Sequence, residues 1–244
     1  MKINWLFIGN VFISGIALGL VAFTNQRFDR QETLGIQVHY KGPTTQYVTD
    51  SMVNKLLIQK NGNSQSFVIS EVDLNSLEKK VKANPYVQDA NVYLTVDKQI
   101  EVVIEQKTPL ARVVNGSPFY LDNRDGVMPL SGLHSARVPL VKGPLEGEAT
   151  ATVRQMLLWI QKDKVLEKSI VAIEYLKNGK FELSTRLYDY KIEMGDATNM
   201  HIKLMNLKSF MVYADKHGLH EIYEKINLQY LNQLVCTKKS ENGI

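Results

Sequence analysis

The chain begins with a continuous apolar stretch, in which polar residues do not recur at the period of an amphipathic helix or strand. Trp5 to Phe23 is a run of 19 residues without a charged side chain. A helix needs about 20 such residues to cross the hydrocarbon core of a bilayer. Ala17–Gly19 could serve as a signal-peptide cleavage site, but the apolar run continues through Leu20–Phe23. The pattern therefore favours an uncleaved transmembrane helix over a cleaved signal peptide.

The flanks of this predicted span leave its orientation open. Lys2 precedes it, while Arg27 and Arg30 follow it, so the distribution of positive charges does not decide which end is cytoplasmic. Gly15 and Gly19 form a GxxxG pattern, which lets a second helix approach closely. Glycines that merely face lipid would explain the same spacing.

Between residues 34 and 106 the hydrophobic period changes several times. Alternation predicts a strand over Leu34–Tyr40, and a period of 3.6 predicts helices over Thr49–Gln59 and Asp73–Ala83. Two further strands follow, around residues 91–96 and 100–105, each with apolar residues on one face. A three-stranded sheet covered on one face by two helices would bury these apolar residues.

Beyond Pro109 the chain predicts short strands separated by turns. Hairpin dipeptides occur at Asn115–Gly116, Asp125–Gly126 and Asn178–Gly179. Helical patterns occupy Thr150–Lys162 and Asn199–Lys216, and one long strand is predicted over Ile226–Thr237.

The predicted fold class is α+β. It comprises a single amino-terminal transmembrane helix, a β-α-α-β-β domain and a mostly antiparallel β domain with flanking helices. The expected boundaries are a tail at 1–4, the span at 5–23, a juxtamembrane linker at 24–33, the first domain at 34–106, the β domain at 107–238 and a tail at 239–244.

Composition excludes several classes of function. Lys and Arg number 29 against 25 Asp and Glu, and the net charge of +4 is spread without a basic block, which argues against nucleic-acid binding. The single cysteine, Cys236, excludes an internal disulfide and a cysteine-based zinc site. Its neighbours supply no base, so a buried or edge-strand thiol is expected.

Candidate catalytic and metal-binding patterns are weak. Ser76 and Lys79 match the S-x-x-K of penicillin-interacting enzymes, but the companion motifs are missing. A cell-envelope hydrolase or transpeptidase that uses this pair is the competing hypothesis, and a solvated helix face is the simpler interpretation. His217 and His220 flank Gly218, which interrupts any helix that would align them on a metal. We expect no metal and no cofactor.

Several short motifs follow one another in a characteristic order along the chain. They are Asn84–Val87, Ala90–Val92, Val102–Glu105, Pro109–Arg112, Tyr120–Asp122 before Asp125–Gly126, Val138–Pro144, Ile192–Gly195 and Ile226–Tyr230. In this order and spacing they resemble the FtsQ/DivIB family of bacterial cell-division proteins, in which a POTRA domain is followed by a β domain. The resemblance covers nearly the whole chain after the predicted span.

The resemblance implies a protein of the division septum. It would have a short cytoplasmic tail, one span in the cytoplasmic (inner) membrane and an extracytoplasmic body. Family members are not enzymes; they bind the bitopic proteins FtsB and FtsL and help to control the septal peptidoglycan synthases. Their POTRA domain is linked to recruitment and to other divisome contacts, so an FtsK-like protein is a further expected partner. A POTRA-type envelope assembly factor is disfavoured, because no series of barrel strands follows.

The last strand is the expected contact with FtsB- and FtsL-like partners. So close to the end of the chain it could expose an edge that accepts a partner strand, although another strand of the same sheet could cover it. The side chains expected to give specificity are Leu228, Tyr230, Leu231, Gln233 and Val235. Tyr230 falls on the tyrosine of the family's D-L-R-Y-like motif. Asn227 and Gln229 replace its aspartate and arginine, which puts any charge-assisted bond of those residues in doubt.

Overall fold

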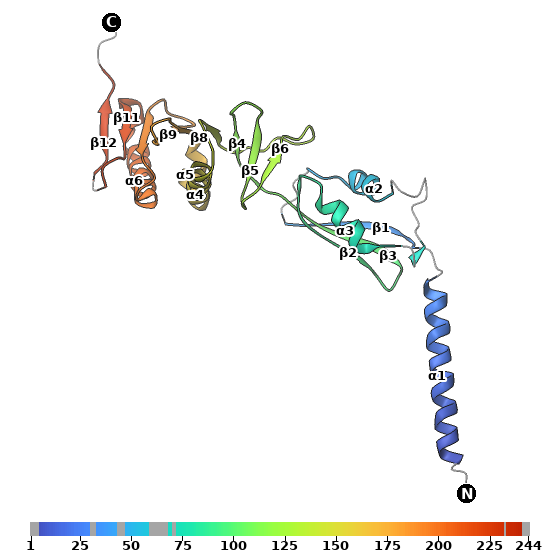
Figure 1. Cartoon of the computed structure of the whole chain (residues 1–244). Helices are drawn as coiled ribbons and strands as arrows, with labels where there is room; N and C mark the ends of the chain where they lie inside the picture. Colours follow the sequence, from blue (N-terminus) through green and yellow to red (C-terminus); the bar gives the residue numbers. More distant parts are fainter. Residues whose placement is uncertain are drawn as a thin grey trace. The chain divides into compact units, whose positions relative to one another are not determined.

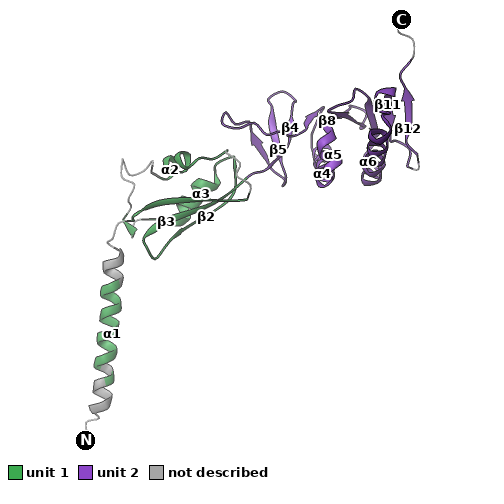
Figure 2. Cartoon of the chain, turned by 180° about the vertical axis from the view of Figure 1, so that it is seen from behind, with its two compact units in different colours: residues 1–106 green, residues 107–244 purple. Residues whose placement is uncertain are grey.

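The computed structural model of the chain describes residues 5–29, 33–42, 47–58, 68–69, 72–231 and 233–240. Side chains of the first helix are described at Asn10 and at 12–24. The chain divides into two compact units, residues 1–106 and residues 107–244 (Figure 2).

The amino-terminal unit begins with one long helix, α1 (Trp5–Asp29). It covers the whole predicted span (Figure 1). In the part of the chain that the structure describes, no helix combines the length and apolar character needed to cross a membrane. The span predicted over 5–23 is thus not confirmed.

The rest of this unit has the predicted β-α-α-β-β order. Its elements are β1 (Gly35–Lys41), α2 (Asp50–Ile58), α3 (Leu74–Lys82), β2 (Val87–Leu94) and β3 (Gln99–Gln106). The sheet order is β1-β3-β2, with β3 parallel to β1 and antiparallel to β2. Each bound lies within two residues of the one that periodicity predicts, except that β2 begins four residues before the predicted residue 91.

The core of this sheet is built from the predicted alternating positions. Ile100, Val102 and Ile104 of β3 are fully buried against residues of α2, α3 and β2. The loop before α2 is tied to the end of β3, because Gln106 Oε1 accepts hydrogen bonds from the amides of Tyr47 and Val48, each at 3.1 Å. The buried polar group of Gln106 is therefore paired with otherwise orphaned backbone donors.

The carboxyl-terminal unit is a nine-stranded sheet with three helices among its described residues. Its elements are β4 (Pro109–Val113), β5 (Phe119–Asp122), β6 (Val127–Pro129), β7 (Leu140–Lys142), α4 (Glu148–Lys162), α5 (Lys164–Ser169), β8 (Ile170–Tyr175), β9 (Phe181–Thr185), β10 (Lys191–Gly195), α6 (Met200–His217), the short 3-10 helix η2 (His220–Ile222), β11 (Tyr223–Asn227) and β12 (Val235–Lys238). The strand order is β12-β11-β10-β9-β8-β7-β4-β5-β6.

Most pairs in this sheet are antiparallel, as predicted, and the β4–β7, β7–β8 and β10–β11 pairs are parallel. The three helices lie on the same side of the sheet (Figure 1) and share one core with it. Met156 and Leu157 of α4 and Leu207 of α6 pack there against Ile173 and Ile192 of the strands.

The three hairpin dipeptides are confirmed as turns between β4 and β5, β5 and β6, and β8 and β9. Helix α5 was not predicted. Asp163 caps it, because its Oδ1 accepts from the amides of Val165 and Leu166. This short helix follows α4 so closely that periodicity does not separate the two.

The single strand predicted over Ile226–Thr237 is wrong. The segment forms two antiparallel strands, β11 and β12, joined by a turn. Asn227 begins this turn, since its Oδ1 accepts from the amide of Gln229 at 2.8 Å, a local bond that competes with strand pairing. On the far side of the turn, Asn206 Nδ2 of α6 donates to the carbonyl oxygen of Leu231 at 3.3 Å.

Candidate protein-binding edge

Strand β12 is the last strand of the nine-stranded sheet. The amide of Lys239 donates to the carbonyl oxygen of Ile222 at 2.8 Å, so it faces the neighbouring strand β11. Backbone directions alternate along a strand, which turns the N–H and C=O groups of Cys236 and Lys238 to the outer side. Within the described residues no strand pairs with that side. The backbone groups of β12 thus form an open edge.

The side chains predicted to contact a partner fall into two groups. Leu228 is 2% exposed and belongs to the core of the sheet, so it cannot contact a partner without unfolding the turn; this corrects the expectation that it lies on an accessible strand. Tyr230 is 54% exposed, and Leu231 and Val235 are also exposed. Gln233 is exposed between them. Four of the five predicted side chains are therefore accessible, with Val235 on β12 and the others in the turn.

Glu193 of β10 fixes the start of the turn. Its backbone oxygen accepts from the amide of Leu228 at 2.9 Å, and its Oε2 accepts from Asn227 Nδ2 at 3.2 Å. Its Oε1 pairs with Lys225 Nζ at 2.9 Å, a hydrogen bond that raises the pKa of Lys225. An ionised aspartate in place of Asn227 has no proton to donate to Glu193. The asparagine that departs from the family motif is thus suited to its neighbour here.

Gln229 is fitted to its surroundings in a similar way. Its Oε1 accepts from Lys180 Nζ at 3.1 Å. Its Cγ covers Gly195, where an added Cβ would lie only 2.6 Å away. An arginine in place of Gln229 would put a second positive charge beside Lys180. At both positions where the chain departs from the motif, a neutral side chain therefore pairs with a charged neighbour: Asn227 with Glu193 and Gln229 with Lys180.

The thiol of Cys236 lies in β12 and is partly buried against the core, as expected for an edge-strand thiol. Burial raises its pKa, which keeps the thiol protonated near neutral pH. A protonated thiol is a poor nucleophile.

The weaker catalytic and metal patterns do not assemble a site among the described residues. Ser76 lies in the first turn of α3, where its amide donates to Asp73 Oδ1 at 3.0 Å, and its side chain has no hydrogen bond to Lys79. His217 lies against Tyr213, whereas His220 is buried. No group of three metal-ligating side chains occurs in the described ranges. Gly15 and Gly19 lie on α1 with no described atom near an added Cβ, so their packing role stays a prediction.

Two family models match the chain. The model described as FtsQ/DivIB, C-terminal related, matches residues 108–237, and the model described as POTRA-like domain matches residues 34–105. No curated protein matches the chain. The first match alone spans more than half of the 244 residues.

The chain belongs to the FtsQ/DivIB family. This membership supports a role as a scaffold in cell division. The family consists of membrane proteins of the division septum that are generally not enzymes. In this FtsQ/DivIB-family protein, the outward-facing backbone N–H and C=O groups of Cys236 and Lys238 were not predicted from the sequence. The alternating pattern gave no sign that the strand is interrupted before them.

Proposed function

We propose that this protein is a non-enzymatic, membrane-anchored scaffold of the bacterial divisome. It binds FtsB- and FtsL-like bitopic partners along the outer edge of β12 and helps to control septal peptidoglycan synthesis. The open edge of β12 in a protein of this family is the observation that carries the proposal.

The backbone of β12 supplies the attraction. Cys236 and Lys238 each offer one donor and one acceptor on the outer side, and an extended partner segment satisfies them by adding a strand. Each such bond contributes about 0.5–1.5 kcal/mol net, because water competes for the same groups. Backbone pairing over so short a strand is therefore weak by itself.

Exposed side chains beside the edge supply the remaining affinity and the specificity. Tyr230 and Leu231 stand in the turn that leads into β12, and Val235 opens the strand. Aromatic and large aliphatic side chains at such positions are typical anchors of protein interfaces. The bond from Asn206 to the Leu231 backbone holds this turn in place before the partner arrives, which lowers the entropic cost of binding.

The helix α1 serves as the membrane anchor in this proposal. Its described apolar side chains, including Phe12, Leu18 and Phe23, are exposed over much of their surface. The body after α1 lies on the extracytoplasmic side, with residues 1–4 in the cytoplasm. Tethering the partners to one membrane raises their effective concentration, so individually weak contacts suffice. Contacts of the POTRA-like domain with an FtsK-like protein or with the septal synthases belong to the same arrangement.

The test compares two substitutions of one residue. In the full chain, held in nonionic detergent micelles, Lys238→Pro removes the outer N–H of β12, while Lys238→Ala removes the charge and keeps that N–H. Proline is tolerated on an edge strand when its nitrogen faces solvent, so pairing with β11 survives. Binding of the extracytoplasmic segments of the FtsB-like and FtsL-like proteins from the same cell is measured by calorimetry.

We expect Lys238→Pro to weaken binding about tenfold and Lys238→Ala to leave it within about twofold, because loss of one backbone bond corresponds to about 1.4 kcal/mol. Tyr230→Ala should weaken binding at least as much. If Lys238→Pro and Tyr230→Ala both bind as tightly as the unaltered chain, the interface lies elsewhere. No binding by the unaltered chain would refute the proposed partners.

A further inference from the structure

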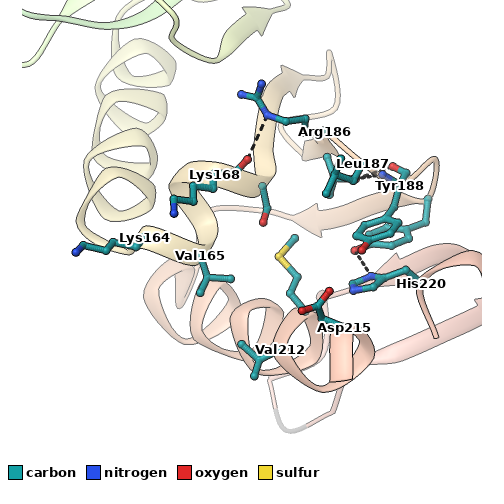
Figure 3. Close-up of a pocket in the computed structure, with 13 residues that line it drawn as sticks. Lys164, Val165, Lys168, Arg186, Leu187, Tyr188, Val212, Asp215 and His220 are labelled. Carbon is teal, nitrogen blue, oxygen red and sulfur yellow. Dashed lines mark hydrogen bonds between the residues drawn. The ribbon is translucent and has the colours of Figure 1, made fainter. Parts of the chain in front are cut away.

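A pocket of about 380 Å³ opens in the carboxyl-terminal unit, and none of its lining residues belongs to β12 (Figure 3). Four elements surround it: α5, the connection between β9 and β10, α6 and η2. Its volume lies at the lower end of the range of about 300–1,000 Å³ for ligand pockets. One large side chain with its flanking backbone fits such a space.

Stacked rings form one wall of the pocket. The rings of Tyr188 and His220 lie 3.7 Å apart between centroids and within 6° of parallel. Tyr190 Oη lies 3.2 Å from His220 Nδ1, and this hydrogen bond fixes the orientation of the imidazole. Burial lowers the pKa of His220, so the ring is neutral near pH 7. The wall is therefore a flat, uncharged surface suited to an apolar or aromatic group.

Three cations belong to the lining of the pocket. Lys164 and Lys168 extend from α5, and Arg186 extends from the β9–β10 connection (Figure 3). Arg186 Nε donates to the carbonyl oxygen of Lys168 at 3.3 Å, which leaves its terminal nitrogens available. In the described part of the chain none of the three forms an ion pair. Asp215 of α6 is the single acidic side chain in the lining.

The rim of the pocket is apolar and exposed. Leu187 is 77% exposed and Val212 is 52% exposed, on opposite sides of the opening. A small molecule held against the stacked rings would leave both side chains in water. A polypeptide that crosses the opening would cover them, since it extends beyond the pocket on both sides. The rim therefore favours a polypeptide occupant.

We propose that this pocket binds an acidic polypeptide segment, which inserts one large apolar side chain against Tyr188 and His220 and pairs its carboxylates with Lys164, Lys168 and Arg186. This site is separate from the edge of β12, and it does not rest on the function proposed for that edge. Charge complementarity selects the segment, and the apolar side chain fixes its register.

The probe is a fluorescein-labelled synthetic peptide with a central phenylalanine flanked by glutamates. Its binding to the full chain in nonionic detergent micelles is followed by fluorescence anisotropy at low salt, with empty micelles as background. A matched peptide carries serine in place of phenylalanine. We expect the phenylalanine peptide to bind and the serine peptide to bind about tenfold more weakly, because a buried aromatic side chain contributes the larger part of such an anchor.

Charge variants identify the site. Lys164→Glu combined with Lys168→Glu should weaken binding more than about tenfold, whereas Asp215→Asn should strengthen it, because it removes the one like charge that faces the peptide. Lys177→Glu is the control: it makes one Lys→Glu change, half the change of charge of the pair, on an exposed turn residue outside the lining.

Four results would overturn the proposal. They are absence of binding to the unaltered chain, equal binding of the serine peptide, an effect of Lys177→Glu as large as that of the paired change, and loss of peptide binding in Lys238→Pro. The last result would place the peptide on the β12 edge. Unchanged peptide binding in Lys238→Pro, together with loss in the lysine variant, supports two separate binding surfaces.

Discussion

Replacing Arg154 by methionine removes the guanidinium that pairs with the buried carboxylate of Asp122. Arg154 extends from α4, and its Nη1 lies 3.3 Å from Asp122 Oδ1 at the end of β5. The same nitrogen donates to the carbonyl oxygens of Asp122 and Arg124, and Nη2 donates to that of Gly126 at 3.2 Å. One side chain thus joins the β5–β6 turn to the helix.

The loss of stability in Arg154→Met depends on which hydrogen bonds the buried carboxylate of Asp122 keeps. Asp122 is 1% exposed, and its Oδ2 has no hydrogen-bond partner among the described atoms. Removing one partner of a buried pair costs about 3–5 kcal/mol, because the other charge stays buried. Asp122 Oδ1 would keep its bonds from the amides of Arg124 and Gly126, at 3.1 and 2.8 Å. We therefore expect a loss near the lower limit, about 3 kcal/mol.

Urea unfolding measures this loss. The chain has two tryptophans, Trp5 and Trp159, and Trp159 lies on α4, where its ring contacts that of His201 of α6. In a Trp5→Phe background the fluorescence of Trp159 reports unfolding of the carboxyl-terminal unit alone. Arg154→Met should lower the urea midpoint by about 1–3 M, since small domains lose about 1–3 kcal/mol per molar urea.

A double-mutant cycle separates the charge effect from lost packing. Asp122→Asn keeps an oxygen acceptor for the two backbone amides and removes the buried charge. Arg154→Met should then cost about 1–3 kcal/mol less in the Asp122→Asn background than in the unaltered one. A loss below about 1 kcal/mol in the unaltered background, or equal losses in both backgrounds, would refute the argument that the buried carboxylate depends on Arg154.

Four further predictions concern single positions. Gly195→Ala should destabilise the carboxyl-terminal unit by about 1–3 kcal/mol in the same urea assay, because Gly195 has φ +73° and an added Cβ would meet Gln229; no change would contradict this. Burial lowers the pKa of His220 in the fold below its ordinary value of 6.5, so the unfolded chain takes up this proton first as the pH falls. His220→Phe should therefore reduce the loss of stability measured on acidification from pH 6.5 down to that lower folded pKa; equal losses in both proteins would exclude His220. Iodoacetamide should alkylate Cys236 at least about tenfold more slowly in the folded chain than in urea, because burial raises the pKa of its thiol; equal rates would mean that the thiol is open. A fluorescent penicillin should label neither the unaltered chain nor Ser76→Ala, and a label lost on that substitution would support the hydrolase hypothesis.

The POTRA-like unit could be predicted because each element there carries a clear period. Ile100, Val102 and Ile104 alternate with polar residues, and their burial follows directly from that alternation. The carboxyl end could not be predicted in the same way. The segment around Leu228 also alternates. However, the side chain of Asn227 accepts a hydrogen bond from the amide of Gln229, two residues later, and the chain turns there. A local side-chain bond of this kind leaves no trace in the hydrophobic period.

The pocket escaped prediction for a different reason. Lys164, Arg186 and Asp215 come from three separate elements, and each is an ordinary charged residue in its own segment. Their proximity depends on how α5 and α6 pack on the sheet. The resemblance to the family, carried by short motifs spread along the chain, could be recognised without any of this packing.

The shortness of β12 connects the edge to the side chains beside it. A long, flat and apolar edge strand invites pairing with any extended chain, and charges on a short strand reduce that risk. β12 has four residues and ends in Lys238, followed by Lys239. With two residues facing outward, backbone pairing is too weak to select a partner by itself. Selection must then come from side chains at the entrance to the strand, and Tyr230 and Leu231 are exposed there. The edge supplies direction and register, while the turn before it supplies most of the affinity, so Tyr230→Ala should weaken binding more than Lys238→Pro does.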